Sequence, residues 1–282
     1  MNIKSFAYVS SPRSGMANRF LVWAKAKVFS KKYGLGFYTS DMYSVHVGPI
    51  IRKEKSKRFY FDYFIKQSFI VKLKLEFIFL FMSKKYNCKF NENINLNNSA
   101  YIFNQLDWTN YFNIINLHRD YLITEFYKII NPKYLKLNDF EEPIVSIHIR
   151  RGDFKVGYSL TPNEYFIDAI NYLRNNIQYF GVVHIFTDAD NNEISDITNL
   201  INVQLYSTGN DLQDLLMLSK SKVIFVSNGS TYSYWSSFLS NSIIIRYDED
   251  KYGKIRIEEN LFEYYWPSEL EHSIPQIKNI LK

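Results

Sequence analysis

The feature that most constrains the fold is the regular alternation of apolar and amphipathic stretches after Pro143. Short apolar runs alternate there with segments of helical periodicity. The expected strands cover residues 144–150, 182–188, 203–207, 222–227 and 242–247, and the expected helices cover 161–176, 191–200, 210–221 and 230–240. Strands that are apolar nearly throughout are typical of a parallel sheet with helices on both faces. We therefore expect a Rossmann-like α/β domain over residues 141–282.

One of these helices begins with a clear set of signals. Thr161 is the expected N-cap, Pro162 the first helical residue, and Glu164 completes a capping box. We therefore expect the Thr161 side chain to bond to the first turn of this helix.

The first half of the chain is less regular. Residues 3–9 are typical of a strand, 18–32 of a helix and 34–40 of a second strand. An amphipathic helix over 120–130 leads into the polar, proline-bounded stretch 131–143, which is typical of an interdomain linker. We expect a first domain over residues 1–140.

Composition limits the kinds of ligand and the cell compartment that suit this protein, but it does not identify a function. The net charge of +6 suits anionic ligands or an anionic membrane surface. Cys88 is the single cysteine, which excludes an intramolecular disulfide and fits a reducing compartment. The N-terminus lacks the long apolar core of a signal peptide. We expect a cytoplasmic protein.

Segment 52–85 interleaves basic and aromatic residues, and its interior charges argue against a membrane-spanning helix. Two interpretations stay open: packing within the domain, or peripheral contact with anionic lipid at the inner face of a bacterial membrane. A basic-aromatic surface also suits single-stranded nucleic acid. Since no recognised nucleic-acid-binding motif accompanies the segment, we expect no nucleic-acid partner.

Charged residues follow the first strand of the regular half. In "SIHIRRGDF", residues 146–154, the strand ends in Arg150, Arg151, Gly152 and Asp153. Ligands of parallel sheets bind at the carboxyl ends of strands, and guanidinium groups suit phosphate oxygens. Asp153 would hold one guanidinium and leave the other for an anion. The alternative is an internal Arg–Asp pair, with His148 a buried core residue.

A second loop, "SNGSTYSYW" over residues 227–235, has the same plan. A strand ends at Ser227, and Ser230 and Thr231 open a helix whose N-terminus suits an anion. Ordinary N-capping by Ser230 or Thr231 is the alternative.

Two further loops contribute weaker signals. "SPRSGMANRF", residues 11–20, supplies Gly15 for conformational freedom and Asn18 for polar reach, and "FTDAD", residues 186–190, supplies Asp188. Several anion-suited loops in one chain favour a phosphorylated ligand. Neither metal-ligand spacing nor a "GxSxG" nucleophile motif is present, so we expect no metal cofactor.

Taken in order, these segments resemble glycosyltransferase family 11, the bacterial α1,2-fucosyltransferases. "SIHIRRGDF" is similar to the family pattern H-x-R-R-G-D-Y, "FTDAD" to F-S-D-D, and "SNGSTYSYW" to N-S-T-F-S-W-W. "SGMANRF" is similar to G-x-G-N-Q-x-F. The strong resemblance covers residues 144–245.

The resemblance implies a GT-B-like architecture of two Rossmann-like domains, with the acceptor side in the first and the donor site in the second. It implies inverting, metal-independent transfer of L-fucose from GDP-fucose to a galactoside hydroxyl, forming an α1,2 linkage in a surface glycan or O-antigen precursor. A lipid-linked acceptor would fit that setting. The alternatives are a transferase of this architecture that uses another nucleotide sugar, and a non-catalytic nucleotide- or glycan-binding protein.

The family motifs also imply roles for individual residues. Arg150 would bind the diphosphate and stabilise the departing GDP, with Asp153 beside it as the second catalytic residue. The expected donor-binding residues are Gly15, Asn18, His148, Arg151, Asp188, Ser227, Ser230 and Thr231.

Overall fold

A computed structural model describes residues 5–40, 60, 62–66, 85–87, 100–106, 112–152, 160–247 and 252–281. The chain divides into two compact units, the first ending at Pro132 and the second beginning its main part at Lys133. The expected boundary at residues 140 and 141 therefore falls inside the second unit. Asp153, Cys88 and most of segment 52–85 lie outside the described residues, so the predictions made for them stay predictions.

The first unit contains a parallel sheet with the strand order β2-β1-β4-β3. Its strands are β1 (Phe6–Val9), β2 (Gly36–Thr39), β3 (Lys85–Asn87) and β4 (Ala100–Phe103). Its helices are α1 (Met16–Tyr33), the 3₁₀ turn η1 (Asn116–His118) and α4 (Arg119–Ile129). α1 ends at Gly34, whose φ of 63° is the left-handed conformation that glycine adopts at helix ends.

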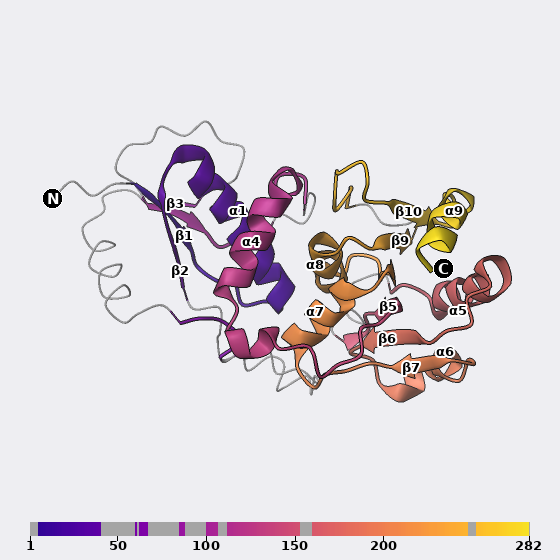
Figure 1. Ribbon diagram of the computed structural model, residues 1–282. Helices are drawn as coiled ribbons and strands as arrows, with labels where there is room; N and C mark the ends of the chain where they lie inside the picture. Colours follow the sequence, from indigo (N-terminus) through magenta and orange to yellow (C-terminus); the bar gives the residue numbers. More distant parts are fainter. Residues whose placement is uncertain are drawn as a thin grey trace. The chain divides into compact units, whose positions relative to one another are not determined.

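The second unit contains a parallel sheet with the order β10-β9-β8-β5-β6-β7 (Figure 1). Its strands are β5 (Val145–Ile149), β6 (Val183–Thr187), β7 (Val203–Leu205), β8 (Val223–Phe225), β9 (Ile243–Tyr247) and β10 (Glu263–Trp266). Its longer helices are α5 (Asn163–Tyr172), α7 (Asp211–Lys220), α8 (Thr231–Leu239) and α9 (Leu270–Leu281). Shorter turns are η2 (Pro132–Leu135), η4 (Leu173–Ile177), η5 (Asn191–Glu193) and α6 (Ser195–Thr198).

Helices cover both faces of this second sheet, as its apolar strands predict. All five residues of β5 are buried. On one face, Ile147 and Ile149 pack with α5 and α9 residues such as Phe166 and Ile277. On the other face, His148 of β5 stacks against a ring of α8. The expected parallel α/β architecture is confirmed.

The capping box expected at the start of α5 is wrong. α5 begins at Asn163 with Pro162 as its N-cap, and no side chain caps it. The Thr161 hydroxyl instead accepts the N–H of Asn228, with 2.8 Å between the atoms. Thr161 therefore bonds to the loop after β8, a long-range contact that local spacing does not reveal.

The strand order reverses at one point of the sheet. Starting from β5, the chain adds β6 and β7 on one side and β8, β9 and β10 on the other. Loops leaving the two strands at such a reversal diverge, and ligands of open α/β sheets bind there, at the carboxyl ends. This edge lies between β5 and β8, the strands that lead into Arg150 and Ser227.

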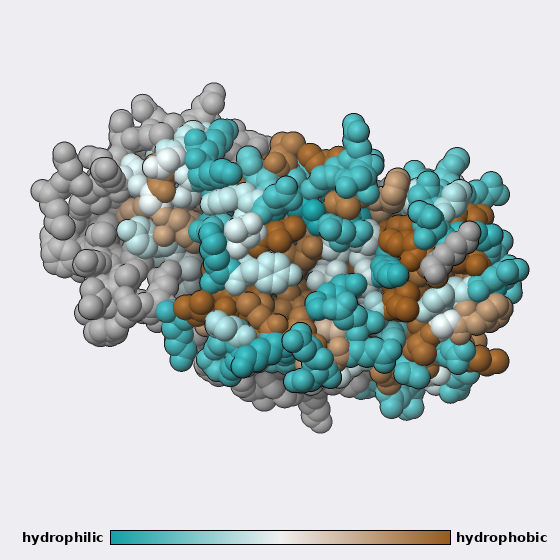
Figure 2. Space-filling model, in the orientation of Figure 1, coloured by the Kyte–Doolittle hydropathy of each residue, from teal (hydrophilic) through white to brown (hydrophobic). Residues whose placement is uncertain are grey.

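Within the described part of the chain, no helix is both long and apolar enough to cross a membrane. On the face that Figure 2 shows, hydrophobic side chains of the second unit are interspersed with hydrophilic ones.

Candidate functional site

An ion pair stands at the carboxyl end of β5. The Arg150 Nη1 atom lies 2.5 Å from Asp188 Oδ2, and the two side chains are 21% and 25% exposed. The other carboxylate oxygen of Asp188 accepts the N–H of Arg151 at 2.8 Å. Asp188, from the end of β6, thus holds the Arg150 guanidinium. The pairing expected for Asp153 stays a prediction, because Asp153 lies outside the described residues.

Ser227 ties the ends of β8 and β5 together across the strand reversal. Its Oγ accepts the N–H of Arg150 at 2.9 Å and donates to the carbonyl of His148 at 2.8 Å. Because the hydroxyl hydrogen is already used, Ser227 fixes the backbone of Arg150 rather than offering a donor to phosphate.

Arg151 is buried, with 5% of its surface exposed. Its guanidinium donates to the carbonyl of Arg150 and to the side chain of Asn163, and it lies 5.9 Å from the ring centroid of Phe166. Burial lowers the pKa of Arg151, an effect opposed by the carboxylates Glu193, Asp188 and Asp196. These contacts give Arg151 a structural role, whereas Arg150 is more exposed.

Gly152 lies next to the Asp188 carboxylate of the ion pair with Arg150. Its φ is +22°, and a Cβ atom there would collide with the Asp188 carboxylate. Glycine is therefore required both by the backbone conformation and by the space that the carboxylate occupies.

His148 is 4% exposed and stacks on Tyr232, with ring centroids 5.1 Å apart and planes at 26°. Its buried Nδ1 makes no hydrogen bond to any described residue. Burial, together with the positive charge of Arg150, lowers the pKa of His148 to about 3. The ring is therefore neutral at pH 7, and its Nδ1 is a buried polar atom near the end of β5.

The N-terminus of α8 follows the loop that leaves β8. Ser230 is the N-cap, but its side chain makes no capping hydrogen bond, so the ordinary capping considered for Ser230 does not occur. An α-helix leaves the N–H groups of its first turn without intrahelical partners, and this end attracts anions. Thr231 is the first residue of that turn.

Gly15 and Asn18 lie in the first unit, at the start of α1. Gly15 is the N-cap with φ of −58°, and a Cβ atom there would meet nothing within 4 Å, so the conformational freedom expected of it is not needed. The Asn18 Oδ1 atom is buried and makes no hydrogen bond to a described residue.

The structure thus gathers the ends of β5, β6 and β8 into one group: His148, Arg150, Arg151, Asp188, Ser227, Ser230 and Thr231. Sequence reasoning missed the parts played by Thr161 and Tyr232. Among the described residues, no cluster of three or more His, Cys, Asp or Glu side chains is suited to hold a metal ion.

Substituting Gly152→Ala tests the packing behind the ion pair. The added methyl group displaces Asp188 and strains the backbone, so we expect a loss of about 1 to 3 kcal/mol in the free energy of unfolding. Urea unfolding measures it. Gly209→Ala is the control, because Gly209 has φ of +81° but open space around its Cβ position. Equal losses in the two variants would contradict the contact with Asp188.

The neutral state of His148 makes stability depend on pH. Because its pKa falls from 6.5 to about 3 on folding, the unfolded chain binds more protons as the pH drops, and stability is lost from about pH 6.5 downward. His148→Phe keeps a ring beside Tyr232 and removes this loss, which amounts to about 2 kcal/mol between pH 7 and pH 5. Urea unfolding at both pH values measures the difference. The same pH dependence in His148→Phe as in the wild type would contradict this effect of His148.

Solved fucosyltransferase structures share this fold at low sequence identity. NodZ α-1,6-fucosyltransferase soaked with GDP-fucose is 13% identical, with a TM-score of 0.52 over 89% of this chain and 98% of its own. The fucosyltransferase NodZ from Bradyrhizobium is 12% identical, with a TM-score of 0.52 over 87% and 96%. POFUT1 in complex with GDP-fucose is 10% identical, with a TM-score of 0.54 over 95% and 98%. These likenesses confirm the expected GT-B-like architecture.

A search of curated protein sequences finds no match to this chain. The family model of glycosyl transferase family 11 matches residues 65–266. This match covers most of the chain and confirms the resemblance seen in the motifs. The chain therefore belongs to glycosyl transferase family 11, and the protein is a glycosyltransferase.

Proposed function

We propose that this protein is an inverting fucosyltransferase that transfers L-fucose from GDP-fucose to a galactoside hydroxyl, forming an α1,2 linkage in a surface glycan or O-antigen precursor. The observation that carries the proposal is Arg150, held by Asp188 at the strand reversal beside the N-terminus of α8. Family membership supports the sugar transfer, and the NodZ and POFUT1 structures with GDP-fucose support the donor.

The charge arrangement suits a departing nucleoside diphosphate. As the bond between fucose C1 and the β-phosphate oxygen breaks, negative charge grows on that oxygen. A guanidinium carries five N–H donors, so Asp188 can orient Arg150 while other nitrogens bind the phosphate. The first turn of α8 adds a partial positive charge at the same edge. Groups fixed in place before reaction stabilise such charge with little reorganisation.

The same geometry supports the remaining donor contacts that we propose. His148 lies stacked on Tyr232 and is neutral, and its buried Nδ1 has no hydrogen bond to a described residue, so we propose that this nitrogen contacts the nucleotide. Ser230 and Thr231 stand at the phosphate end of α8. In an inverting displacement, the acceptor oxygen bonds to C1 opposite the leaving phosphate and gives up its proton. Asp153 is one candidate to accept that proton, and Gly15 and Asn18 are proposed to contact the donor from the first unit.

The setting that we propose is the cytoplasmic face of a bacterial membrane, where a lipid-linked acceptor would be presented. The net charge of +6 and the basic-aromatic segment 52–85 support peripheral contact with anionic lipid.

A donor screen tests the proposed activity. In buffer with excess EDTA, we expect GDP and GDP-fucose to raise the melting temperature and GDP-fucose to be hydrolysed slowly without acceptor, because Arg150 supplies the fixed positive charge that a metal would otherwise supply. Thermal shift and chromatographic detection of GDP measure the two effects. Stabilisation and turnover with a UDP-sugar instead would overturn the donor, and loss of hydrolysis in EDTA would overturn the metal-independent mechanism.

Arg150→Gln and Arg151→Gln should fail in different ways. Arg150→Gln removes the charge that meets the leaving group, so we expect kcat to fall by about 100-fold or more with little change in melting temperature. Arg151→Gln removes buried hydrogen bonds, so we expect a loss of about 1 to 3 kcal/mol in stability. Hydrolysis kinetics and urea unfolding separate the two. Lys220→Ala, which removes a cation from the outlying pair with Glu142, is the control. Unchanged kcat in Arg150→Gln would contradict its role.

A further inference from the structure

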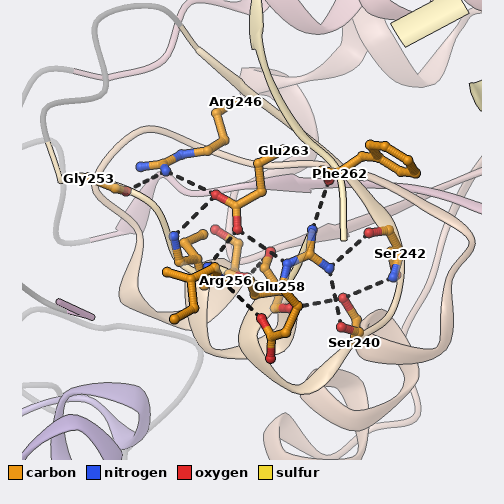
Figure 3. Close-up of polar contacts among 12 residues, drawn as sticks. Ser240, Ser242, Arg246, Gly253, Arg256, Glu258, Phe262 and Glu263 are labelled. Atoms are coloured by element: carbon orange, nitrogen blue, oxygen red, sulfur yellow. Dashed lines mark hydrogen bonds and ion pairs between the residues drawn. The ribbon is translucent and has the colours of Figure 1, made fainter. Parts of the chain in front are cut away.

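A second cluster of charges lies where β9 and β10 run side by side (Figure 3). Arg246 of β9 and Arg256 of the connecting segment face one carboxylate, Glu263 of β10. Glu263 Oε2 lies 3.4 Å from Arg246 Nη1, Glu263 Oε1 lies 3.2 Å from Arg256 Nε, and these side chains are at most 3% exposed. Buried charges are costly unless they are paired and hydrogen-bonded, so each of these side chains depends on its partners in the network.

The network holds the backbone of the segment between β9 and β10. Glu263 accepts the N–H groups of Ile255 at 3.1 Å and Arg256 at 2.8 Å. Arg246 Nη1 donates to the carbonyl of Gly253 at 2.5 Å. Figure 3 shows the contacts of Arg246 with Gly253 and of Glu263 with Arg256. The segment that follows Tyr252 is therefore anchored to the two strands through charged side chains.

Arg246 also reaches α8. Its guanidinium lies 5.2 Å from the ring centroid of Tyr234 and 5.2 Å from that of Tyr265. A planar guanidinium stacks well on aromatic faces. The position of the Tyr234 ring is therefore coupled to the charge network of β9 and β10.

Tyr234 in turn holds the loop before α8. Its hydroxyl accepts the N–H of Gly229 at 2.8 Å. Gly229 has φ of +67°, and a Cβ atom there would lie 3.2 Å from the Tyr252 ring. The Gly229 turn is thus connected to Arg246 in two ways. Tyr234 contacts both Gly229 and Arg246. Tyr252 lies next to Gly229 and precedes Gly253, whose carbonyl accepts from Arg246.

We propose that Arg246 and Tyr234 are positioning residues that hold the Gly229 turn, and with it Ser227 and the first turn of α8, in the shape that binds the donor diphosphate. The inference rests on the proposed function. Neither residue touches the reacting atoms. They act by ordering the turn before the donor arrives, so that less ordering remains to be done on binding.

Tyr234→Phe tests this role, because it keeps the ring beside Arg246 and removes the hydroxyl that accepts the Gly229 amide. We expect the Kd for GDP to rise by about 5- to 30-fold. The KM for GDP-fucose in the hydrolysis assay should rise by a similar factor, with a smaller effect on kcat. Isothermal titration calorimetry and hydrolysis kinetics provide the two measurements. Arg246→Lys, which keeps the charge but loses the planar stack, should weaken GDP binding in the same direction and serves as the second variant if Tyr234→Phe is unstable.

Tyr165→Phe is the matched control. It removes a buried tyrosine hydroxyl that donates to the carbonyl of Ile245 at 3.2 Å in the same unit. We expect comparable stability loss with unchanged GDP affinity. Wild-type GDP affinity in both Tyr234→Phe and Arg246→Lys would overturn the positioning role while leaving the donor site intact. Equal weakening in Tyr165→Phe would also overturn it, since the effect would then be general destabilisation. If the wild-type protein does not bind GDP, the proposed function itself fails.

Discussion

The reversal of strand order between β5 and β8 is the constraint on which the chemistry of the second unit depends, because it makes the loops after these two strands leave in opposite directions. One loop carries Arg150 and the other leads into α8. Ser227 spans the reversal, since its single hydroxyl bonds to the amide of Arg150 and to the carbonyl of His148. The positive charge and the helix N-terminus therefore face the same edge of the sheet.

Burial distinguishes Arg150 from three other arginines of this unit. Arg151, Arg246 and Arg256 are buried, and their guanidinium groups bond to carbonyls or carboxylates of the protein itself. Such charges hold backbone segments in place, because a buried cation whose partner moves loses its compensation. Arg150 is partly exposed and pairs with an equally exposed Asp188. Under the proposed function, Asp188 orients this guanidinium while its other N–H donors bind the phosphate.

The sequence predicted the sheet and most of its helices well, because alternation and periodicity are local properties. It also singled out the strand-end residues from His148 to Gly152 and from Ser227 to Thr231. An error arose where a side chain has a choice of partner: Thr161 has the spacing of a helix cap, yet it bonds to Asn228. For Ser230, capping was the alternative to an anion site, and its side chain makes no capping bond. β10 and α9 were not predicted.

What the sequence determined by itself is the parallel α/β architecture of the second unit and the chemistry of the residues at its strand ends, since both follow from residue types at short, regular intervals. What only the tertiary structure decided is how those residues pair. Ile149 lies opposite Thr187 in the β5–β6 ladder, and this register brings Asp188 beside Arg150. Strand register depends on contacts between distant segments. The spacing of residues along the chain therefore does not reveal which carboxylate pairs with Arg150.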